Sequence, residues 1–577
     1  MLGCGYSLPY DMKKVVLLAI NAKYVHSALP VWLLAGGVLK FARLPYDVEI
    51  VEATVQQSIF DIAAKVTAHG ADVVGISTYI WNACKLLGLL KILREWLPRA
   101  VFVLGGPEAS HNAEYWLNNG ADHVVCGEGE RSFPVLLDSL DSSGASQLVA
   151  GKQTTQGLAR MESVQPEQAQ PEPAKPVQAQ PDPTPIDPYT DAYFEALGDR
   201  IAYLETSRGC TFQCAFCLSG GTGVKFFPLE TAKERIYKLS QSGVRTIKLV
   251  DRTFNCDAGR AYDLFEYIIR LDTPCRFHFE VAPDLFDERT LKLLASAPPG
   301  RIQLEAGLQS FFEPALKASF RHTKPEIAKS NIRALVSNQN IHIHIDLIAG
   351  LPYETLPVFM DSFDIAYALG AHTLQLGFLK LLHGSALRAR AEALGIRYSA
   401  APPYEITDSA WLSVEDIKAL KLTENALKHT YNKMRFLSAI EYVLSASGIR
   451  PFLLYHALGT DAPNHGTHLD RYAVQVHDCF SKLPGVDEGE LRERMICDWL
   501  GMVKGKNMPQ VMKTPDRRRG DVADVARKLL GHTICRDELA FLPSGGFAVA
   551  DSGTRDAVTG LYKVLLSDMN MSHVSPV

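Results

Sequence analysis

Five short, almost wholly apolar runs, each separated from the next by a longer stretch, constrain the fold of the beginning of this chain. In order they read VVLLAI, DVEIVEA, DVVGIST, AVFVLGG and HVVCGEG. Strands of this composition are typical of a parallel sheet that helices cover on both faces, because neither face then meets water. The stretches 58–70 and 83–96 between them have helical length and periodicity. The pattern predicts a doubly wound α/β domain over residues 12–141.

A Pro-, Gln- and Ala-rich segment follows at residues 142–187, and it includes QPEQAQPEPAKPVQAQPDPTP. It holds too few large apolar side chains to offset the conformational entropy that ordering would cost. Residues 142–187 are therefore predicted to form a flexible, partly extended linker.

A second alternation of strands and helices occupies residues 196–400, but its strands differ from those of the first domain. In IHIHIDLIAG the apolar residues Ile341, Ile343 and Ile345 alternate with His342, His344 and Asp346, and RIQLEAGLQ and FHFEVAP follow a similar pattern. Alternation with period two puts the polar side chains on one side of a sheet, which in a barrel is the lumen. The polar groups on such a face need hydrogen-bond partners, which either a bound ligand or the groups themselves must provide. The side chains there that could exchange a proton are Tyr203, His278, Glu280, His342 and His344.

The carboxyl-terminal part, residues 401–577, is predicted to be mostly helical, because segments such as 413–447 have helical length and periodicity. From Asp516 onward the pattern is mixed and favours neither helix nor strand. This part contains no motif that points to a particular chemistry.

The composition of this chain of 577 residues argues against several classes of function. The formal net charge is −5, without the basic excess typical of nucleic-acid-binding proteins. No apolar run reaches the roughly 20 residues of a membrane-spanning helix. Residues 1–11 lack the features of a signal peptide. Met12, which KKVVLLAI follows, is the expected start. Eleven cysteines at uneven spacing do not resemble a disulfide framework. A cytoplasmic protein without nucleic-acid or membrane partners is therefore expected.

Three of the cysteines, Cys210, Cys214 and Cys217, lie within eight residues as C-x3-C-x2-C, in the stretch ETSRGCTFQCAFCLSGG. A structural zinc site would require a fourth ligand, and the nearest other thiols, Cys256 and Cys275, lie in helix- and strand-like segments. Soft, crowded thiolates suit an iron–sulfur cluster best. Three thiolates on a four-iron cube leave one iron open to a substrate or cofactor.

This loop resembles the cluster-binding loop of the radical S-adenosylmethionine (SAM) superfamily, including the aromatic residue Phe216 just before the last cysteine. The resemblance implies that the following strands form a partial (β/α)6 barrel and that the three cysteines hold a [4Fe–4S] cluster. It also implies that the open iron chelates SAM and that the reduced cluster cleaves SAM to a 5′-deoxyadenosyl radical. A flavodoxin- or ferredoxin-type protein would then supply the electron.

The SAM contacts of the superfamily are matched less closely. LVDRTFN, with Asp251 and Arg252, stands where the family has a Gly-Gly-Glu turn for the methionine amine, and Asp251 offers the same kind of acceptor. LEAGLQS and DLIAGLP resemble the segments that support the ribose, the carboxylate and the adenine. For each residue there, packing or pairing across the lumen is the alternative. The further SAM contacts implied are Glu305, Gln309, Arg321, Asp346 and Gly350.

In an open parallel sheet, ligands bind at the carboxyl ends of the strands. In the first domain these ends carry glycines, in GGPEAS and GEGE, that allow a large ligand to approach the backbone. The sequence contains neither a G-x-G-x-x-G loop after its first strand nor a P-loop. The pattern resembles the cobalamin-binding domain that precedes the barrel in one class of radical SAM enzymes. The residues then implied to line the corrin are Asn21, Tyr24, Ser77, Thr78, Tyr79, Trp81, Asn82, Gly105, Gly106, Pro107, Glu108, Gly127, Glu128 and Gly129.

The D-x-H-x-x-G motif, whose histidine replaces the base of cobalamin, is absent from the sequence. The resemblance therefore implies that cobalamin binds base-off, without a protein imidazole. His26 lies at a suitable strand end but lacks the context of that motif. Tyr79, Trp81 and Asn82 are expected to pack at the lower face of the ring, with ordinary loop anchoring as the alternative.

GFLKLLHGS, at residues 377–385, and the helical carboxyl-terminal third are similar to a large bacterial subgroup of these enzymes. The two implied cofactors predict methyl transfer from methylcobalamin to an unactivated carbon, or a phosphinate phosphorus, of a small molecule or peptide. Three alternatives stay open: a radical rearrangement without methylation, a methylthiotransferase with a second cluster on Cys4, Cys84 and Cys126, and a cobalamin sensor without catalysis. The sequence does not identify the residue that acts on the substrate.

Overall fold

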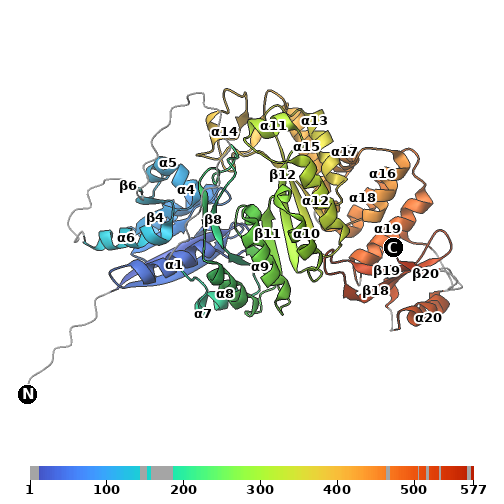
Figure 1. Ribbon diagram of the computed structural model, residues 1–577, viewed down its shortest axis with the longest axis horizontal. Coiled ribbons are helices and arrows are strands. Elements are labelled where there is room, and N and C mark those ends of the chain that lie inside the picture. Colours follow the sequence, from blue (N-terminus) through green and yellow to red (C-terminus); the bar gives the residue numbers. More distant parts are fainter. Residues whose placement is uncertain are drawn as a thin grey trace, which may run out of the picture. The chain divides into compact units, whose positions relative to one another are not determined.

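The computed structural model describes residues 12–142, 153–156, 186–462, 468–504, 506–514, 519–531, 535–567 and 574–576. The chain forms two compact units, and Figure 1 traces their elements along the sequence. The first unit comprises Met1–Phe254, Arg270–Phe279 and Lys380–Ile406. The second unit comprises Asn255–Ile269, Glu280–Leu379 and Thr407–Val577.

The amino-terminal part of the first unit is a parallel sheet with the strand order β2-β1-β3-β4-β5-β6. This is the doubly wound α/β domain that the apolar runs predict. Its strands are β1 (Lys13–Asn21), β2 (Tyr46–Thr54), β3 (Val73–Ser77), β4 (Val101–Gly105), β5 (His123–Cys126) and β6 (Gln153–Gln156). Its helices are α1 (Leu29–Phe41), α2 (Ile59–Thr67), α3 (Ala83–Trp96), α4 (Pro107–His111), α5 (Ala113–Asn118) and α6 (Gly129–Ser142).

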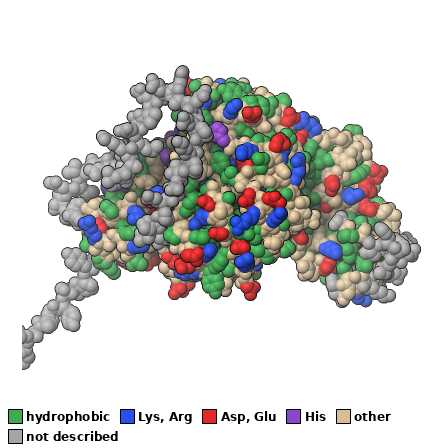
Figure 2. Space-filling model, in the orientation of Figure 1, with side chains coloured by type: hydrophobic (Ala, Val, Ile, Leu, Met, Phe, Trp, Pro, Cys, Tyr) green, Lys and Arg blue, Asp and Glu red, His purple; other side chains and the backbone are tan. Residues whose placement is uncertain are grey.

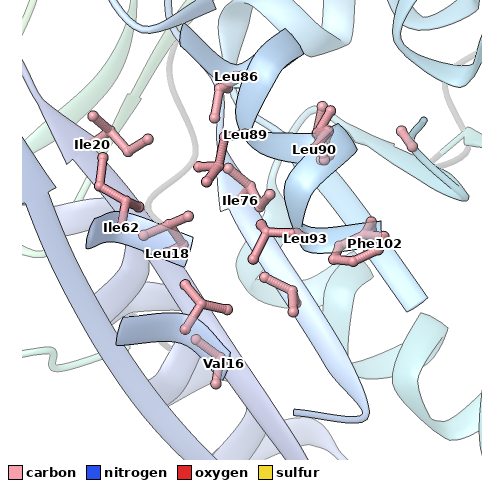
Figure 3. Packing of buried hydrophobic residues seen from close by; sticks show 14 of the residues in the cluster. Val16, Leu18, Ile20, Ile62, Ile76, Leu86, Leu89, Leu90, Leu93 and Phe102 are labelled. Carbon is pink, nitrogen blue, oxygen red and sulfur yellow. The ribbon is translucent and has the colours of Figure 1, made fainter. Parts of the chain in front are cut away.

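Both faces of this sheet are buried, which explains why its strands are nearly continuous apolar runs. Alternate residues of β1 enter two separate cores. Val16, Leu18 and Ile20 pack with α2 and α3 on one face, whereas Val15 and Leu17 pack with α1 and α6 on the other. Figure 3 shows the first of these cores, in which aliphatic side chains of β1 and β3 meet those of α2 and α3. With both faces covered, the strand ends are the part of the sheet that a ligand can reach.

The predicted linker at residues 142–187 is described only in part. Gln153–Gln156 form β6, which pairs in parallel with β5 and so continues the sheet. Ile186 is buried, and its carbonyl oxygen accepts a hydrogen bond of 2.5 Å from Arg235. The remaining residues of the predicted linker lie outside the described residues.

The second alternation contributes parallel strands to each unit. In the first unit β10 (Thr246–Leu249) pairs with both β7 (Ala202–Leu204) and β11 (Arg276–Val281). In the second unit β13 (His342–Ala349) pairs with both β12 (Ile302–Gln309) and β14 (Thr373–Phe378). Helices separate successive strands, as in a (β/α) barrel. The helices of this region are α7 (Asp191–Leu197), α8 (Leu229–Ser240), α9 (Ala258–Arg270), α10 (Glu288–Ala295), α11 (Glu313–Ala318), α12 (Pro325–Ser337) and α13 (Leu356–Tyr367).

Two further segments of the first unit bear on the site. An antiparallel hairpin of β8 (Ser207–Cys210) and β9 (Gly223–Phe226) follows β7. The segment Lys380–Ile406 carries α14 (Ala386–Ala389) and β15 (Arg397–Tyr398).

The period-two alternation of the barrel strands is visible in their burial. In β12 and β13, buried aliphatic side chains alternate with half-buried side chains, most of them polar. One face of these strands packs against helices such as α12 and α13. The predicted polar face is therefore confirmed for these strands.

The carboxyl-terminal part of the second unit begins with helices, as predicted. They are α15 (Val414–His429), α16 (Leu437–Ser447), α17 (Pro451–Asp461), α18 (Leu469–Phe480) and α19 (Glu488–Met502). The region after Asp516, which the sequence pattern left unassigned, contains α20 (Arg519–Leu530) and a four-stranded antiparallel sheet. The strands of that sheet, in order, are β17 (Leu539–Phe541), β18 (Phe547–Arg555), β19 (Tyr562–Ser567) and β20 (Val574–Pro576).

The surface carries charges of both signs. On the face shown in Figure 2, Lys and Arg side chains are interspersed with Asp and Glu side chains, in keeping with the formal net charge of −5. Among the helices that the structure describes, none has the length and the apolar composition to cross a bilayer.

Glu354 is a fully buried carboxyl group in the second unit. Its exposed fraction is 0%, and it accepts hydrogen bonds from Ser310 Oγ at 2.5 Å and Ser362 Oγ at 3.3 Å. Burial raises the pKa of Glu354 from its ordinary 4.5 to about 7, although the two serines lower it. The folded protein therefore holds this proton more tightly than the unfolded chain. The resulting stabilisation is complete below pH 4.5 and is lost as the pH rises through about 7.

We predict that Glu354→Gln removes this pH dependence. Between pH 4.5 and about 7, the free energy of unfolding of the wild type should fall by about 3 kcal/mol relative to that of the variant. Thermal unfolding of the full chain at steps of pH measures the difference. Glu313→Gln removes an exposed carboxylate on α11 and should keep the wild-type profile. Parallel profiles for the wild type and Glu354→Gln would contradict the assignment.

Candidate active site

The three clustered cysteines lie in the loop of the β8–β9 hairpin of the first unit. Cys210 pairs with Gly223 at the mouth of this loop. Cys210 and Cys214 are buried and Cys217 is half-buried, and the Cys217 N–H donates to the Cys214 carbonyl oxygen at 3.0 Å. Gly209 has a φ of +98°, and a Cβ there would lie 2.0 Å from the Gly223 carbonyl oxygen. The hairpin therefore closes in this form only with glycine at position 209.

The surroundings of the thiols fit a thiolate-ligated cluster. No disulfide links the cysteines that the structure describes. The Thr253 hydroxyl lies 3.4 Å from Cys210 Sγ, and the Ser219 N–H donates to Cys217 Sγ at 3.4 Å. Hydrogen bonds to ligand sulfurs stabilise thiolates and tune the potential of a bound cluster. The donor set, three soft sulfur atoms from one loop, is the one that a four-iron cluster with an open position requires.

Arg208, which directly precedes Gly209, connects the hairpin to the predicted corrin loop GEGE. Its guanidinium binds both carboxylate oxygens of Glu205, at 2.7 and 2.9 Å, and Glu130 Oε1 at 2.5 Å. Lys225, the partner of Arg208 across the hairpin, donates to Glu128 at 3.0 Å. Burial lowers the pKa of Arg208, but Glu205 and Glu130 outweigh it and raise that pKa overall. The first unit thus holds a permanent cation between these two loops.

Asp251 and Arg252 follow β10, where the superfamily places a contact to the SAM amine. Asp251 is 1% exposed and accepts hydrogen bonds from Thr206 N at 3.1 Å, Thr206 Oγ1 at 2.7 Å and Ser207 Oγ at 2.5 Å. Burial raises the pKa of Asp251 to about 6, although these hydrogen bonds lower it. Asp251 therefore holds the start of the hairpin in place, while Arg252 is exposed.

Several predicted corrin-lining residues are buried inside the first domain, where they hold the strand-end loops in shape. The Asn82 side chain donates to the carbonyl oxygens of Ser77 at 3.0 Å and Ile20 at 3.3 Å, and its exposed fraction is 0%. Asn21 donates to Glu52 at 2.8 Å. Asn82, expected at the lower face of the ring, thus supports the loop from within. The buried members of the predicted set are Asn21, Ser77, Thr78, Asn82 and Glu108.

An aromatic platform, formed by Tyr79 and Trp81, lies at the same edge of the sheet. Their rings are stacked, with centroids 4.2 Å apart and planes at 8°. Trp81 is 48% exposed, and its indole N–H donates to the Ile20 carbonyl oxygen at 3.1 Å, which holds the ring in place. Tyr24 is more exposed, at 71%. Exposed aromatic rings at the ends of parallel strands provide a flat apolar surface that fits one face of a corrin.

The GGPEAS loop makes a close approach to the loop after β3. Gly106 has a φ of +98°, and a Cβ there would lie 2.7 Å from the Thr78 carbonyl oxygen. Glu108 accepts a hydrogen bond of 2.5 Å from the Tyr404 hydroxyl. Of the other predicted loop residues, Gly105 ends β4, Pro107 begins α4, and Gly127–Gly129 join β5 to α6.

His26 contacts the barrel strand β7. Its Nδ1 lies 2.6 Å from the Tyr203 hydroxyl, and Ser27 Oγ donates to the Ile201 carbonyl oxygen at 2.7 Å. Burial lowers the pKa of His26, and the nearby lysines lower it further, so the imidazole is neutral at pH 7. The loop after β1 is therefore tied to the first barrel strand through this pair.

In the second unit, three of the predicted polar residues converge. Oxygen and nitrogen atoms of Glu305, His344 and Asp346 all lie within 4.8 Å of one another, and His344 Nε2 is 3.0 Å from Asp346 Oδ1. Burial raises the pKa of Asp346, and His344 lowers it in part. These groups have the chemistry to hold a cation, and His344 and Asp346 also form an ion pair with one another, which is the pairing alternative left open by the sequence.

The other predicted SAM contacts are placed as follows. The Arg321 guanidinium donates to the Gly307 carbonyl oxygen at 2.8 Å, beside the register shift between Gly307 and Gln309 in β12. Gly350 is buried just after β13, and Phe216, in the first unit, is half-buried in the cysteine loop. A contact of these residues with SAM stays a prediction.

The thiols of the predicted second cluster have other contacts. The Cys84 thiol donates to the Pro402 carbonyl oxygen at 3.7 Å, and the Cys126 thiol donates to the Ser110 carbonyl oxygen at 3.6 Å. Cys4 lies outside the described residues.

Three residues of the site were missed by the sequence analysis. The position of Arg208 two residues before Cys210 could be read from the sequence, but its contact with Glu130 spans 78 residues. Thr253 and Tyr404 had no local signal, because their contacts with Cys210 and Glu108 span 43 and 296 residues.

Three family models match successive parts of the chain. A B12 binding domain matches residues 15–137, the Radical SAM superfamily matches residues 204–365, and a protein of unknown function (DUF4080) matches residues 392–537. The first match covers most of the sheet of β1–β5, and the second begins at the end of β7 and covers the barrel strands β10 to β13. The chain therefore carries a B12-binding domain followed by a radical SAM domain.

The curated relatives include methyltransferases. The cytidylyl-2-hydroxyethylphosphonate methyltransferase of Streptomyces wedmorensis is 24% identical over 346 residues, which cover 54% of this chain and 64% of the relative. The cobalamin-dependent radical SAM methyltransferase TokK of Streptomyces tokunonensis is 24% identical over 451 residues, which cover 74% and 63%. The chain thus spans slightly less than two thirds of the length of these two relatives.

A solved structure supports the fold. The cobalamin-dependent S-adenosylmethionine radical enzyme OxsB, with aqua-cobalamin bound, is similar with a TM-score of 0.54 and 15% identity. The match covers 84% of this chain and 79% of that one. At this identity the likeness concerns the fold.

We predict that Gly209→Ala prevents the cysteine loop from holding iron. The new Cβ would meet the Gly223 carbonyl oxygen, so the hairpin would have to open. After anoxic reconstitution the iron content per chain should fall by about half or more. Gly223→Ala is the matched control, because Gly223 also has a positive φ, +69°, but no described atom lies within 4 Å of its Cβ position. It should lose only about 1–2 kcal/mol of stability and keep its iron.

Proposed function

We propose that this protein transfers a methyl group from methylcobalamin to an unactivated carbon. The chain belongs to the radical SAM proteins with an amino-terminal B12-binding domain. The observation that carries the proposal is the placement of the three-cysteine hairpin and the B12-binding sheet in one compact unit, with direct contacts between their loops. The two cofactor sites then form parts of one reaction centre.

Cys210, Cys214 and Cys217 would hold a [4Fe–4S] cluster, and the Ser219 N–H would donate a hydrogen bond to the sulfur of Cys217. When bound, the cluster and SAM supply the 5′-deoxyadenosyl radical, and methylcobalamin supplies the methyl group. The chain's own contribution is to bind these groups, orient them and exclude water. Asp251, with both carboxylate oxygens bound to the start of the hairpin, would orient the cluster loop.

Cobalamin would bind base-off on the aromatic platform of Tyr79 and Trp81. The Trp81 ring, held at the carboxyl edge of the sheet by its hydrogen bond to the Ile20 carbonyl oxygen, would offer cobalamin an apolar surface in place of an imidazole. The glycine loops GGPEAS and GEGE would flank the ring. Tyr24 would cover its exposed edge.

The substrate would be a small molecule or a peptide, in line with the phosphonate named for the relative in Streptomyces wedmorensis. A flavodoxin- or ferredoxin-type protein would reduce the cluster. We place the protein in the cytoplasm, because no disulfide links its described cysteines and a thiolate-bound cluster needs reducing surroundings. Nucleic acid is not expected as a partner, since the formal net charge is −5.

The first test is reductive cleavage of SAM. Cys214→Ala should lower the formation of 5′-deoxyadenosine by about 100-fold or more, because the cluster loses one of its three ligands. Cys84→Ala, which changes an exposed thiol, should keep both the activity and an iron content of about four per chain. An unchanged rate in Cys214→Ala would refute the cluster assignment. A wild type with about eight irons per chain would instead favour a methylthiotransferase.

A second test concerns the lower face of cobalamin. The electron paramagnetic resonance spectrum of bound cob(II)alamin should lack nitrogen hyperfine splitting, and His26→Ala should leave it unchanged. Trp81→Ala should weaken cobalamin binding by about tenfold, since it removes half of the aromatic platform. Trp96→Ala, at an exposed position at the other end of α3, is the control and should bind normally. A nitrogen splitting that disappears in His26→Ala would refute base-off binding without a protein imidazole.

A further inference from the structure

Residues Lys380–Ile406 of the first unit form a strap that contacts both of the loops assigned above to the cofactors. The two ends of the strap are joined. The Leu381 N–H donates to the Tyr404 carbonyl oxygen at 2.9 Å, and Lys380 forms a β-bridge with Glu405. The 380–406 strap is therefore a closed loop, with α14 between its ends.

At one end of the strap, Tyr404 covers Glu108 of the GGPEAS loop. The Tyr404 hydroxyl donates to Glu108 Oε1 at 2.5 Å, and both residues are 3% exposed. The Arg388 guanidinium lies 4.9 Å from the centre of the Tyr404 ring, and the His383 ring stands edge-on to it at 4.9 Å. Burial raises the pKa of Tyr404 and Glu108 raises it further, so the phenol keeps its proton and stays a donor. A buried carboxylate of the GGPEAS loop thus takes a hydrogen bond from the strap.

A second contact brings the strap against the end of α4. Gly384 has a φ of +83°, and a Cβ there would lie 2.2 Å from His111 Nδ1. The strap can approach the GGPEAS loop this closely only because position 384 has no side chain.

At α14 the same strap contacts the cysteine loop. The Leu387 N–H donates to the Ala215 carbonyl oxygen at 2.7 Å, and Ala215 lies directly after the second cysteine. Both residues are buried, at 0% and 1% exposed. The helical turn that carries Leu387 also carries Arg388, whose guanidinium lies against Tyr404.

We propose that the 380–406 strap is a positioning element that couples the cysteine loop to the GGPEAS loop, with Tyr404 as its positioning residue. The inference rests on the proposed function, in which these two loops hold the cluster and cobalamin. The connection runs from Glu108 through Tyr404, Arg388 and Leu387 to Ala215, and each step is a hydrogen bond, a ring contact or part of one helical turn.

Such a connection has a thermodynamic consequence. If a change at the cysteine loop alters the affinity of the GGPEAS loop for its ligand, the reverse effect has the same size. The redox state of the cluster should therefore change the affinity for cobalamin. A residue with a merely structural role would change the affinity for cobalamin equally in both redox states of the cluster. A positioning residue would change the ratio of the two affinities.

The experiment measures this ratio in the full chain. Protein with reconstituted cluster is titrated with cob(II)alamin under anoxic conditions, once with the cluster oxidised and once with it reduced. In the wild type the two dissociation constants should differ by about fivefold or more. Tyr404→Phe keeps the ring against Arg388 but removes the donor to Glu108. Both constants should then rise by about tenfold, and their ratio should fall by about half or more.

Tyr398→Phe is the matched control. Tyr398 lies on the same strap with its ring 5.0 Å from the Arg388 guanidinium, and its hydroxyl has no hydrogen bond to any described residue. Both constants and their ratio should stay at wild-type values in this variant. Gly384→Ala forces the strap away from His111 and should lower the ratio of the two dissociation constants, as Tyr404→Phe does. This second variant tests the inference if Tyr404→Phe does not fold.

Two outcomes would overturn the inference alone: a wild-type ratio of one, or a ratio in Tyr404→Phe that equals that of the wild type. A wild type that takes up iron but binds no cobalamin would overturn the proposed function as well. The two failures are therefore distinguishable.

Discussion

The half-buried guanidinium of Arg208 is the interaction on which the arrangement of the first unit depends. It is held by Glu205, at the end of the first barrel strand, and by Glu130, at the start of α6 in the B12-binding domain. Removing either carboxylate would leave this poorly solvated charge with fewer acceptors, so the two sides of the contact are held together. Because Arg208 is covalently joined to Gly209 and the cysteine loop, the same contact sets where the three thiols lie.

Two chemically different connections thus hold the cysteine loop against the B12-binding domain. At the GEGE loop the connection is ionic. It includes the ion pair of Lys225 with Glu128, which is exposed to solvent and is therefore screened by salt. At the GGPEAS loop the connection is a buried hydroxyl–carboxylate bond from Tyr404, followed by a backbone hydrogen bond from Leu387. Salt screens a buried contact of this kind far less. In the proposed function, the two connections would hold the loops for the cluster and for cobalamin in a fixed relative position.

Much of the fold could be predicted from sequence because its elements have clear periods. Strand β1 is apolar on both faces because helices cover both, and β13 alternates because one of its faces is fully buried while the other is half-buried and mostly polar. The strands β6 and β17 to β20 were not predicted. Strand β6 is a short run of Gln and Thr at a sheet edge, where only one neighbouring strand defines it. In β18 the apolar residues occupy only the first half of the strand, so neither the period of a strand nor that of a helix extends far enough to be recognised.

The sequence by itself determined the ligand chemistry: three thiols at C-x3-C-x2-C, the glycines at the strand ends and the polar alternation of the barrel strands. These are local features, and a period or a spacing along the chain records them directly. Only the tertiary structure decided which of these groups meet. The contact of His26 with Tyr203 spans 177 residues, and that of Glu108 with Tyr404 spans 296. Such pairs depend on how separate elements pack, and nothing in the residues next to either partner encodes the other.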